Sequence, residues 1–460
     1  MKKTTTSKNN GEKLLLVLVF TLIFSVMNAT IFNVVMPVIS IEFDLSPSQV
    51  SWILSSYMIV YAIGSLIFGK LADKYRLKDL LTFGLIFFAL GSIVGLAATE
   101  YWMVILGRVL QASGASVIPA TAMIIPVRYF SQERRGRALG MVATGLALGT
   151  ALGPIVSGLI TGLTGWRFLF CLSLLPLLTL PFFRKYLDDE RGQTGKIDFI
   201  GGFLLAGTVT LLLLAITQGN GLLLSAGVVL MISFILRIRS AVEPFIQPGL
   251  FKNKSYSLGL VIAFLATSLA FGIPFLTPLL LADVNHLSPV TIGLVMFPAA
   301  IAAALMGRKG GKLADEKGNP FLVYTATLFI FICYVLLSTF VGVSPFIIML
   351  LLIFGNVGQI FMQIAVINTI SRTLSKEQTG VGMGFFSMFN FISAATATSL
   401  IGKILDFSSP GFHFNPVPSI SATFIYSNIF FVLAFTAVAA GLLYYMQFGS
   451  ALKKLRNSPN

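Results

Sequence analysis

The chain has 460 residues, of which 56% are hydrophobic and only 11% are charged. Soluble domains carry roughly 25% charged residues, so the composition excludes an ordinary water-soluble protein and indicates one whose solvent is the lipid bilayer. The net charge of +15 would suit a nucleic-acid-binding protein, but the positions of the charges along the chain give them a different role.

Fourteen segments are apolar for long enough to cross a bilayer, which takes about 20 residues in a helix. They are residues 14–37, 52–71, 79–99, 101–126, 138–161, 167–183, 199–217, 221–236, 256–281, 290–307, 321–343, 345–370, 380–402 and 425–447. The first is too long for the apolar core of a signal peptide. Only Gln218-Gly219-Asn220 separates the seventh and eighth segments, so twelve spans with an interfacial hairpin are the alternative.

Lysine and arginine are distributed unequally between the two sides of this predicted bundle. All but three of the 32 lie near the termini or in alternate loops, the exceptions being Arg108, Arg167 and Lys403. Positive residues are retained on the cytoplasmic side, so we expect both termini to be cytoplasmic. The excess charge then faces anionic lipid, and we expect the bilayer rather than nucleic acid as its partner.

A five-residue sequence occurs twice at corresponding places. Gly69-Lys-Leu-Ala-Asp73 ends the second span, and Gly311-Lys-Leu-Ala-Asp315 follows the tenth. Parallel repeats are typical of transporters that move one half against the other, although a chance match of small residues is the alternative. We therefore predict a six-helix bundle at 1–183, an inserted helix pair with flanking cytoplasmic loops at 184–255, and a second six-helix bundle at 256–460.

The first copy, from Gly69 to Leu81, resembles the loop signature of the major facilitator superfamily. In that signature Gly69 would permit close helix approach, Asp73 would face a helix N-terminus or a cation, and Lys74 would hold the cytoplasmic side. The resemblance implies a role in conformational gating for these residues and for Gly311 and Asp315. The sequence departs from the signature at Arg76, where the family usually has glycine.

The fifth span contains Gly149, Gly153, Pro154 and Gly158, a pattern that resembles an exporter motif of the same superfamily. Small residues four apart let helices pack closely, and the proline bends its helix. Such spacing also occurs in many other membrane helices, which is the alternative explanation. The resemblance implies export rather than import.

Three further segments resemble the fourteen-helix drug:proton antiporters, a group that includes Gram-positive tetracycline and quaternary-ammonium exporters. They are Met27 to Pro37 in the first span, Asp198-Phe-Ile-Gly201 before the seventh, and Glu243-Pro-Phe-Ile-Gln-Pro before the ninth. Relatives often carry an aspartate at the position of Asn28. A proton carrier within a membrane is normally an Asp, Glu or His, and no acidic residue of this chain is predicted near the bilayer centre. Proton binding could be displaced to a loop acid or to the substrate.

Arg108 is the one basic residue predicted deep inside a span, in a segment that resembles the family's buried-arginine motif. An arginine there costs roughly 2.5–3.5 kcal/mol, so it requires polar partners. At 1.5 Å per residue, Arg108 and Asn28 lie about 10 and 13 Å from the outer ends of their helices. We expect Asn28 and Gln111 to solvate the guanidinium beside a substrate cavity. The alternative is that Arg108 only holds the first and fourth helices together.

A polar stripe on the twelfth span supplies the other wall of the predicted cavity, because spacings of three and four place its members on one helical face. Hydrogen bonding between helices is the alternative role for any one of them. The predicted substrate-cavity residues are Asn28, Asn33, Tyr57, Tyr61, Arg108, Gln111, Asn356, Gln359, Gln363 and Asn390.

The predicted protein is an all-α, polytopic membrane protein with the major-facilitator fold, in a bacterial plasma membrane and monomeric. We expect secondary-active export of small amphipathic organic compounds, as in multidrug or antibiotic efflux, by proton antiport and alternating access. A buried cation without a carboxylate disfavours a lone quaternary ammonium and favours neutral, zwitterionic or anionic compounds. Import or facilitated diffusion of a small metabolite is the alternative. No Cys/His cluster, HExxH motif or nucleotide-binding loop occurs, so we expect no metal, no cofactor and no enzyme activity.

Overall fold

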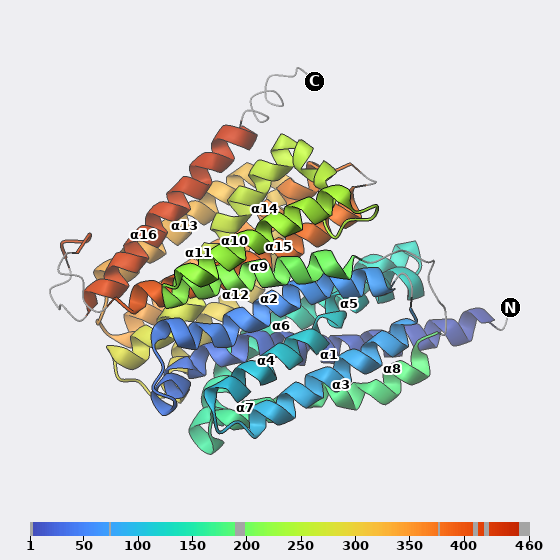
Figure 1. Ribbon diagram of the computed structural model, residues 1–460, viewed down its shortest axis with the longest axis horizontal. Helices are drawn as coiled ribbons and strands as arrows, with labels where there is room; N and C mark the ends of the chain where they lie inside the picture. The colour runs from blue at the N-terminus through green and yellow to red at the C-terminus, as the bar shows by residue number, and fades with distance from the viewer. Residues whose placement is uncertain are drawn as a thin grey trace. The chain divides into compact units, whose positions relative to one another are not determined.

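The computed structural model describes residues 3–72, 75–188, 198–375, 378–407, 413–417 and 423–449. All regular elements in these ranges are helices (Figure 1). The chain divides into two compact units, one of residues 1–44 and 52–245 and the other of residues 45–51 and 246–460. The inserted helix pair thus belongs to the first compact unit. The division of the chain into three functional parts stays a prediction.

The described residues of the first unit form ten α-helices. They are α1 (Lys3–Glu42), α2 (Pro47–Ala72), α3 (Leu77–Leu96), α4 (Tyr101–Ala115), α5 (Val117–Tyr129), α6 (Gln132–Thr164), α7 (Leu169–Leu172), α8 (Leu180–Tyr186), α9 (Phe199–Gln218) and α10 (Gly221–Ser240). Short 3-10 turns, η1 (Trp166–Phe168) and η2 (Leu175–Thr179), flank α7, so the sixth span is a broken helix.

The described residues of the second unit form six α-helices and two shorter helical turns. They are α11 (Lys254–Asp283), α12 (Pro289–Lys317), α13 (Asn319–Thr339), α14 (Pro345–Arg372), α15 (Thr379–Leu405) and α16 (Phe424–Tyr444), with η3 (Pro248–Lys252) before α11 and a π-turn, η5 (Tyr445–Gly449), after α16. In this unit α14 packs on α12 and α13, α13 packs on α16, and α11 packs on α15.

The described residues contain 14 helical segments long and apolar enough to cross a membrane, which confirms the fourteen-span prediction. The decisive pair is α9 and α10, since these were the segments that a twelve-span chain would leave at the interface. Each has 20 residues, a length of about 30 Å, which matches the hydrocarbon thickness of a bilayer.

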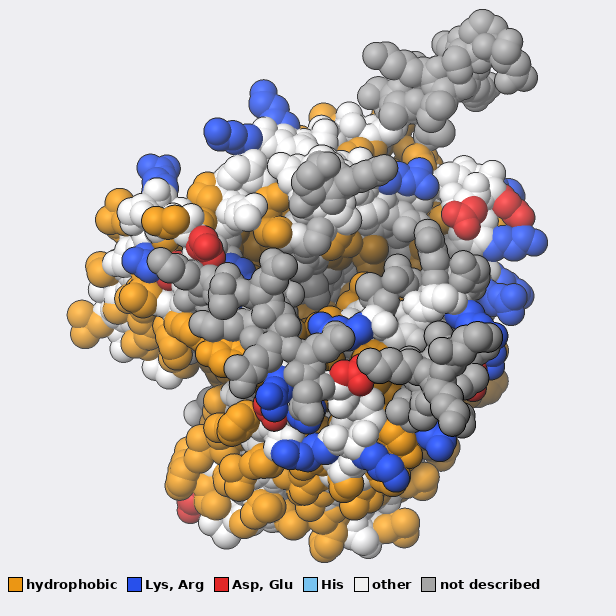
Figure 2. Space-filling model, turned by 90° about the vertical axis from the view of Figure 1, so that its right-hand side faces the viewer, with side chains coloured by type: hydrophobic (Ala, Val, Ile, Leu, Met, Phe, Trp, Pro, Cys, Tyr) orange, Lys and Arg blue, Asp and Glu red, His pale blue; other side chains and the backbone are white. Residues whose placement is uncertain are grey.

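Figure 2 is viewed from the side on which α1 begins. Among the coloured side chains in Figure 2, lysine and arginine clearly outnumber aspartate and glutamate on this face. That distribution is the one that the positive-inside rule associates with a cytoplasmic surface. The orientation of the chain in the membrane stays a prediction.

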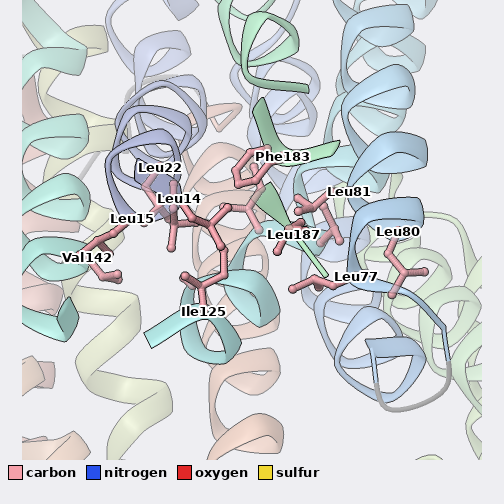
Figure 3. Packing of buried hydrophobic residues seen from close by; sticks show 14 of the residues in the cluster. Leu14, Leu15, Leu22, Leu77, Leu80, Leu81, Ile125, Val142, Phe183 and Leu187 are labelled. Atoms are coloured by element: carbon pink, nitrogen blue, oxygen red, sulfur yellow. The ribbon is translucent and has the colours of Figure 1, made fainter. Parts of the chain in front are cut away.

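The first unit has a buried apolar cluster at the same end of the bundle. Its leucines come from the start of α1 and from α3, and they meet side chains of α5, α6 and α8 (Figure 3). Leu14, Leu81 and Phe183 are all fully buried in it. The cluster packs α1 against the bundle from Leu14 onward, and α1 itself begins at Lys3 rather than at residue 14.

Glycines bring α3 and α4 together at the level of the buried arginine. A methyl group on Gly91 would lie 2.6 Å from the carbonyl oxygen of Gly107, and one on Gly107 would lie 2.9 Å from that of Gly91. Backbone atoms cannot retreat as a flexible side chain can. Close approach here therefore requires glycine on both helices.

The predicted exporter motif lies on α6, which packs along α1. A methyl group on Gly149 would lie 2.6 Å from the carbonyl oxygen of Ile23, whereas one on Gly140 of the same helix would meet nothing within 4 Å. Further along the contact, the Ser157 hydroxyl donates to the Ile31 carbonyl at 2.5 Å.

We predict opposite effects for two alanine substitutions on α6. Gly149→Ala should destabilise the protein by about 1–3 kcal/mol, because the added methyl group overpacks the contact with α1. Gly140→Ala should stabilise it by about 0.5–1 kcal/mol, because alanine loses less backbone entropy in a helix. Thermal unfolding of the two purified variants in detergent measures both. Equal unfolding temperatures would mean that α1 and α6 do not approach as closely as described.

Asp198 joins the start of α9 to the end of α10 and has 2% of its side chain exposed. Its carboxylate accepts hydrogen bonds from the backbone of Gly201 at 3.0 Å and of Phe245 at 3.2 Å, and it pairs with Arg237 Nε at 3.0 Å. Lys70 then donates to the Pro244 carbonyl at 3.4 Å. The Asp198 and Glu243 segments, singled out separately in the sequence, therefore form one junction.

Candidate functional site

Arg108 lies in the middle of α4 and is fully buried, with no exposed surface. Its guanidinium is placed between two aromatic rings, 4.4 Å from the ring centre of Phe32 on α1 and 4.1 Å from that of Tyr57 on α2. An aromatic face attracts a cation, and a desolvated pair of this kind is worth about 2 kcal/mol. The two rings therefore offset part of the cost of burying the charge.

Hydrogen bonds hold the guanidinium from three helices. Its Nη1 donates to the side-chain oxygen of Asn28 at 2.9 Å and to that of Gln111 at 3.1 Å. Its Nε donates to the carbonyl oxygen of Ile53 at 3.2 Å. The contact predicted from helix depth, between Arg108, Asn28 and Gln111, is therefore present.

Two serines fix the orientation of these amide side chains. The Asn28 amide nitrogen donates to Ser173, and that of Gln111 donates to Ser92 at 2.9 Å. Because the amide nitrogen of each side chain donates to a serine, the amide oxygen faces Arg108. Neither serine could be predicted from the sequence, since isolated serines are common in membrane helices and nothing marks these two.

The buried charge has no carboxylate among its described contacts. The hydrogen-bond acceptors around it are neutral, and its Nη2 and the Tyr57 hydroxyl make no hydrogen bond to the described residues. A buried cation without an opposite charge is costly. Two buried donors, the Arg108 Nη2 and the Tyr57 hydroxyl, are thus left without an acceptor among the described residues.

The other predicted residues of the first unit lie around this centre with different roles. Tyr61 stacks on Tyr57 with ring centres 5.7 Å apart, which extends the aromatic surface away from Arg108. Asn33 is buried one and a half turns beyond Asn28 on α1. Its place in a substrate cavity stays a prediction.

A hollow in the second unit contains three of the four predicted polar residues there. It is lined by Gln359 and Gln363 of α14 and Asn390 of α15. Thr267 of α11, which was not predicted, also lines it and donates to Asn390 at 3.1 Å. Asn356 lies outside this lining and donates to the Leu352 carbonyl of its own helix at 2.9 Å.

The predicted gating residues are only partly described. Asp73 and Lys74 lie outside the described residues. Gly69 lies in the last turn of α2, and a methyl group on it would meet nothing within 4 Å. Gly311 and Asp315 lie in the last turns of α12, which continues to Lys317. Of the exporter motif, Gly153 faces Thr30 of α1, and Pro154 and Gly158 are buried within α6.

Fourteen spans, with polar groups buried inside the bundles, define a polytopic membrane transporter. The family model of the Major Facilitator Superfamily matches residues 18–398. The chain therefore belongs to this superfamily. Its place as an integral, multi-pass membrane protein follows from the same match and from the fourteen spans.

Curated relatives and solved structures agree with this assignment. The chain is 27% identical over 399 residues to the riboflavin transporter RibZ of Clostridioides difficile (strain 630), covering 85% of this chain and 87% of the relative. It is 28% identical over 352 residues to multidrug resistance protein 3 of Bacillus subtilis (strain 168), covering 73% and 68%. A bacterial homolog of the human lysosomal transporter Spinster has the same fold, with a TM-score of 0.69, 15% identity and coverage of 97% and 98%.

Proposed function

We propose that this chain is a secondary-active exporter of amphipathic organic compounds, working by alternating access and driven by protons. The observation that carries the proposal is the contact of α6 with α1, where Gly149 and Gly153 place the exporter-like motif against the helix of Asn28. The multidrug resistance relative supports the same direction of transport. We further propose a bacterial plasma membrane, cytoplasmic termini and a monomer.

The chemistry around Arg108 limits the substrate. A permanent organic cation brought near a guanidinium that lacks a counter-charge is repelled, and the repulsion grows as the surrounding dielectric falls. A neutral, zwitterionic or anionic compound can instead accept from Nη2 and from the Tyr57 hydroxyl. We propose that such compounds are exported in preference to quaternary ammonium compounds.

Expression in a drug-sensitive bacterial strain tests this proposal. We expect the minimum inhibitory concentration to rise at least about fourfold for some neutral or zwitterionic amphiphiles and to stay unchanged for ethidium-like cations. The matched control is the same strain expressing Arg108→Gln, for which the protection should disappear. Resistance to ethidium that Arg108→Gln leaves unaffected would contradict the proposed substrate preference.

A second candidate function is the transport of a small metabolite. It is favoured by the relative named as a riboflavin transporter, because a vitamin of that kind is planar, uncharged at its ring system and rich in acceptor groups. Accumulation assays in whole cells distinguish the two functions. An exporter lowers the steady-state cell content of the compound and an uncoupler restores it, whereas an importer or facilitator raises the cell content.

A further inference from the structure

A hollow of the first unit lies where α1 and α6 begin, and it is called the α1–α6 hollow below. Residues of α1, of the first turns of α6 and of the turn between α5 and α6 line it. Its empty volume, the open side included, is about 450 Å³, many times the roughly 30 Å³ that a water molecule occupies. The α1–α6 hollow therefore has room for a group of several heavy atoms.

The lining of this hollow changes from charged to apolar with depth. The membrane-spanning stretches of α1 and α6 begin at Gly11 and Arg137. Glu12, Arg134 and Arg137 lie at these starts, whereas Met141 lies four residues further along α6, about 6 Å at 1.5 Å per residue. The polar region of a bilayer is also about 5–7 Å deep on each side. The charged part of the hollow thus lies at the level of lipid headgroups, and its apolar part at the level where acyl chains begin.

Two arginines supply the positive charge of the α1–α6 hollow. Arg134 and Arg137 are three residues apart on α6, which places them on one face of that helix. Both are exposed, and none of the ion pairs between described residues uses either of them. A guanidinium binds a phosphate through two parallel N–H donors. The pair is therefore available to a phosphate that approaches from the open side.

One carboxylate, that of Glu12 on α1, belongs to the same lining. Two positive side chains and one negative side chain give the described lining a net charge of +1. A group with a single negative charge neutralises the hollow, whereas a zwitterion does not. The carboxylate repels a phosphate, so it faces another part of the bound group, and as an acceptor it suits a hydroxyl. The lining thus matches a phosphodiester with a hydroxylated substituent.

The apolar side of the hollow continues into an exposed face of α1. Leu16, in the lining, is 60% exposed, and Phe20, one turn further along, is 40% exposed. The ring of Phe24 follows at 4.7 Å from that of Phe20. Leu15 of the lining belongs to the buried cluster that also contains Val142 of α6 (Figure 3). A free phosphate would leave the exposed face unused, whereas a phospholipid places an acyl chain along it.

We propose that the α1–α6 hollow binds a phosphatidylglycerol-type lipid, which has one phosphodiester, a hydroxylated headgroup and two acyl chains. The phosphate accepts from Arg134 and Arg137, a headgroup hydroxyl donates to Glu12, and an acyl chain lies along Leu16 and Phe20. The site goes beyond the proposed transport function and does not depend on it, because its ligand is a component of the membrane and not the transported compound.

Native mass spectrometry of the purified full-length protein tests the site. The protein in detergent is titrated separately with dioctanoyl phosphatidylglycerol, dioctanoyl phosphatidylethanolamine and glycerol 1-phosphate, and the fraction that carries one molecule gives each dissociation constant. We expect phosphatidylglycerol to bind about fivefold more tightly than phosphatidylethanolamine, because only the former neutralises the lining. Glycerol 1-phosphate, which lacks acyl chains, should bind at least about tenfold more weakly than phosphatidylglycerol.

Either of two results with the wild-type protein would overturn the proposal. Equal or tighter binding of phosphatidylethanolamine would mean that the net charge of the lining does not select the lipid. Glycerol 1-phosphate that binds as tightly as phosphatidylglycerol would make the hollow a site for soluble phosphate compounds.

Variants locate the binding within the hollow. Arg134→Gln combined with Arg137→Gln should weaken phosphatidylglycerol binding at least about tenfold, because both phosphate contacts are lost. The matched control is Lys252→Gln combined with Lys254→Gln, which removes two exposed positive charges from the second unit and should change the affinity less than about twofold. All four side chains are exposed, so both variants should keep the wild-type unfolding temperature. An unchanged affinity in the arginine variant, or an equal loss in the two variants, would contradict a site in this hollow.

Discussion

Substituting Arg108 by methionine should leave the protein folded and reduce transport by at least about tenfold. Methionine removes an unpaired buried charge but leaves the side-chain oxygens of Asn28 and Gln111 without their donor, so the unfolding temperature should fall moderately while the protein stays folded. Transport should fall because the charge-assisted hydrogen bond that Nη2 would donate to a substrate, worth about 1.5–3 kcal/mol, is lost. Flux of a neutral or zwitterionic amphiphile into proteoliposomes and thermal unfolding are measured on the same preparation.

This substitution separates the two roles that the sequence left open for Arg108. If the guanidinium only joins α1, α2 and α4, a folded Arg108→Met protein should transport at the wild-type rate. Arg239→Met is the matched control, because Arg239 is exposed near the end of α10. It should change neither stability nor flux. Wild-type flux in Arg108→Met would contradict a substrate-binding role.

Removing the carboxylate of Asp198 should cost about 3–5 kcal/mol of unfolding free energy, since the substitution leaves Arg237 and two backbone N–H groups without their partner. The buried carboxylate joins the start of α9, the end of α10 and the segment at Phe245. We expect Asp198→Ala to unfold at a clearly lower temperature in detergent and to yield less protein from membranes.

An exposed ion pair provides the control for Asp198. Glu316 contacts Lys312 at 3.5 Å on the surface of α12, and both side chains are more than half exposed. Such pairs contribute about 0.3–0.5 kcal/mol, so Glu316→Ala should be close to the wild-type protein. If Asp198→Ala and Glu316→Ala unfolded at the same temperature, the junction would not hold α9 and α10 in place.

The spans could be read from the sequence because length and hydropathy alone decide whether a helix crosses a bilayer. The contact of Arg108 with Asn28 and Gln111 also followed, from the rise per residue and from the rule that a buried charge requires polar partners. The spans and this contact both depend only on the depth of residues along a helix. Neither depends on which neighbour each helical face meets.

The rest of the site depends on how helices are rotated about their axes. Phe32 stacks on the guanidinium and Thr267 holds Asn390, yet neither stands out among many phenylalanines and threonines in the chain. The Asp198 junction joins residues 47 positions apart through hydrogen bonds to backbone groups. Those donors are present at every residue except proline, so sequence cannot single them out. By its spacing in the sequence, Asn356 shares a helical face with Gln359. Its amide nitrogen nevertheless donates to a carbonyl oxygen of its own helix.

Proton-driven flux into inverted membrane vesicles tests the exporter function most directly. The vesicles carry the full-length protein, and an acidic lumen is imposed in the presence of a neutral or zwitterionic amphiphile. The proposed exporter should accumulate the compound in the lumen, and an uncoupler should release it. Equilibration to equal concentrations on both sides, unaffected by the uncoupler, would contradict secondary-active export and would leave a facilitator in its place.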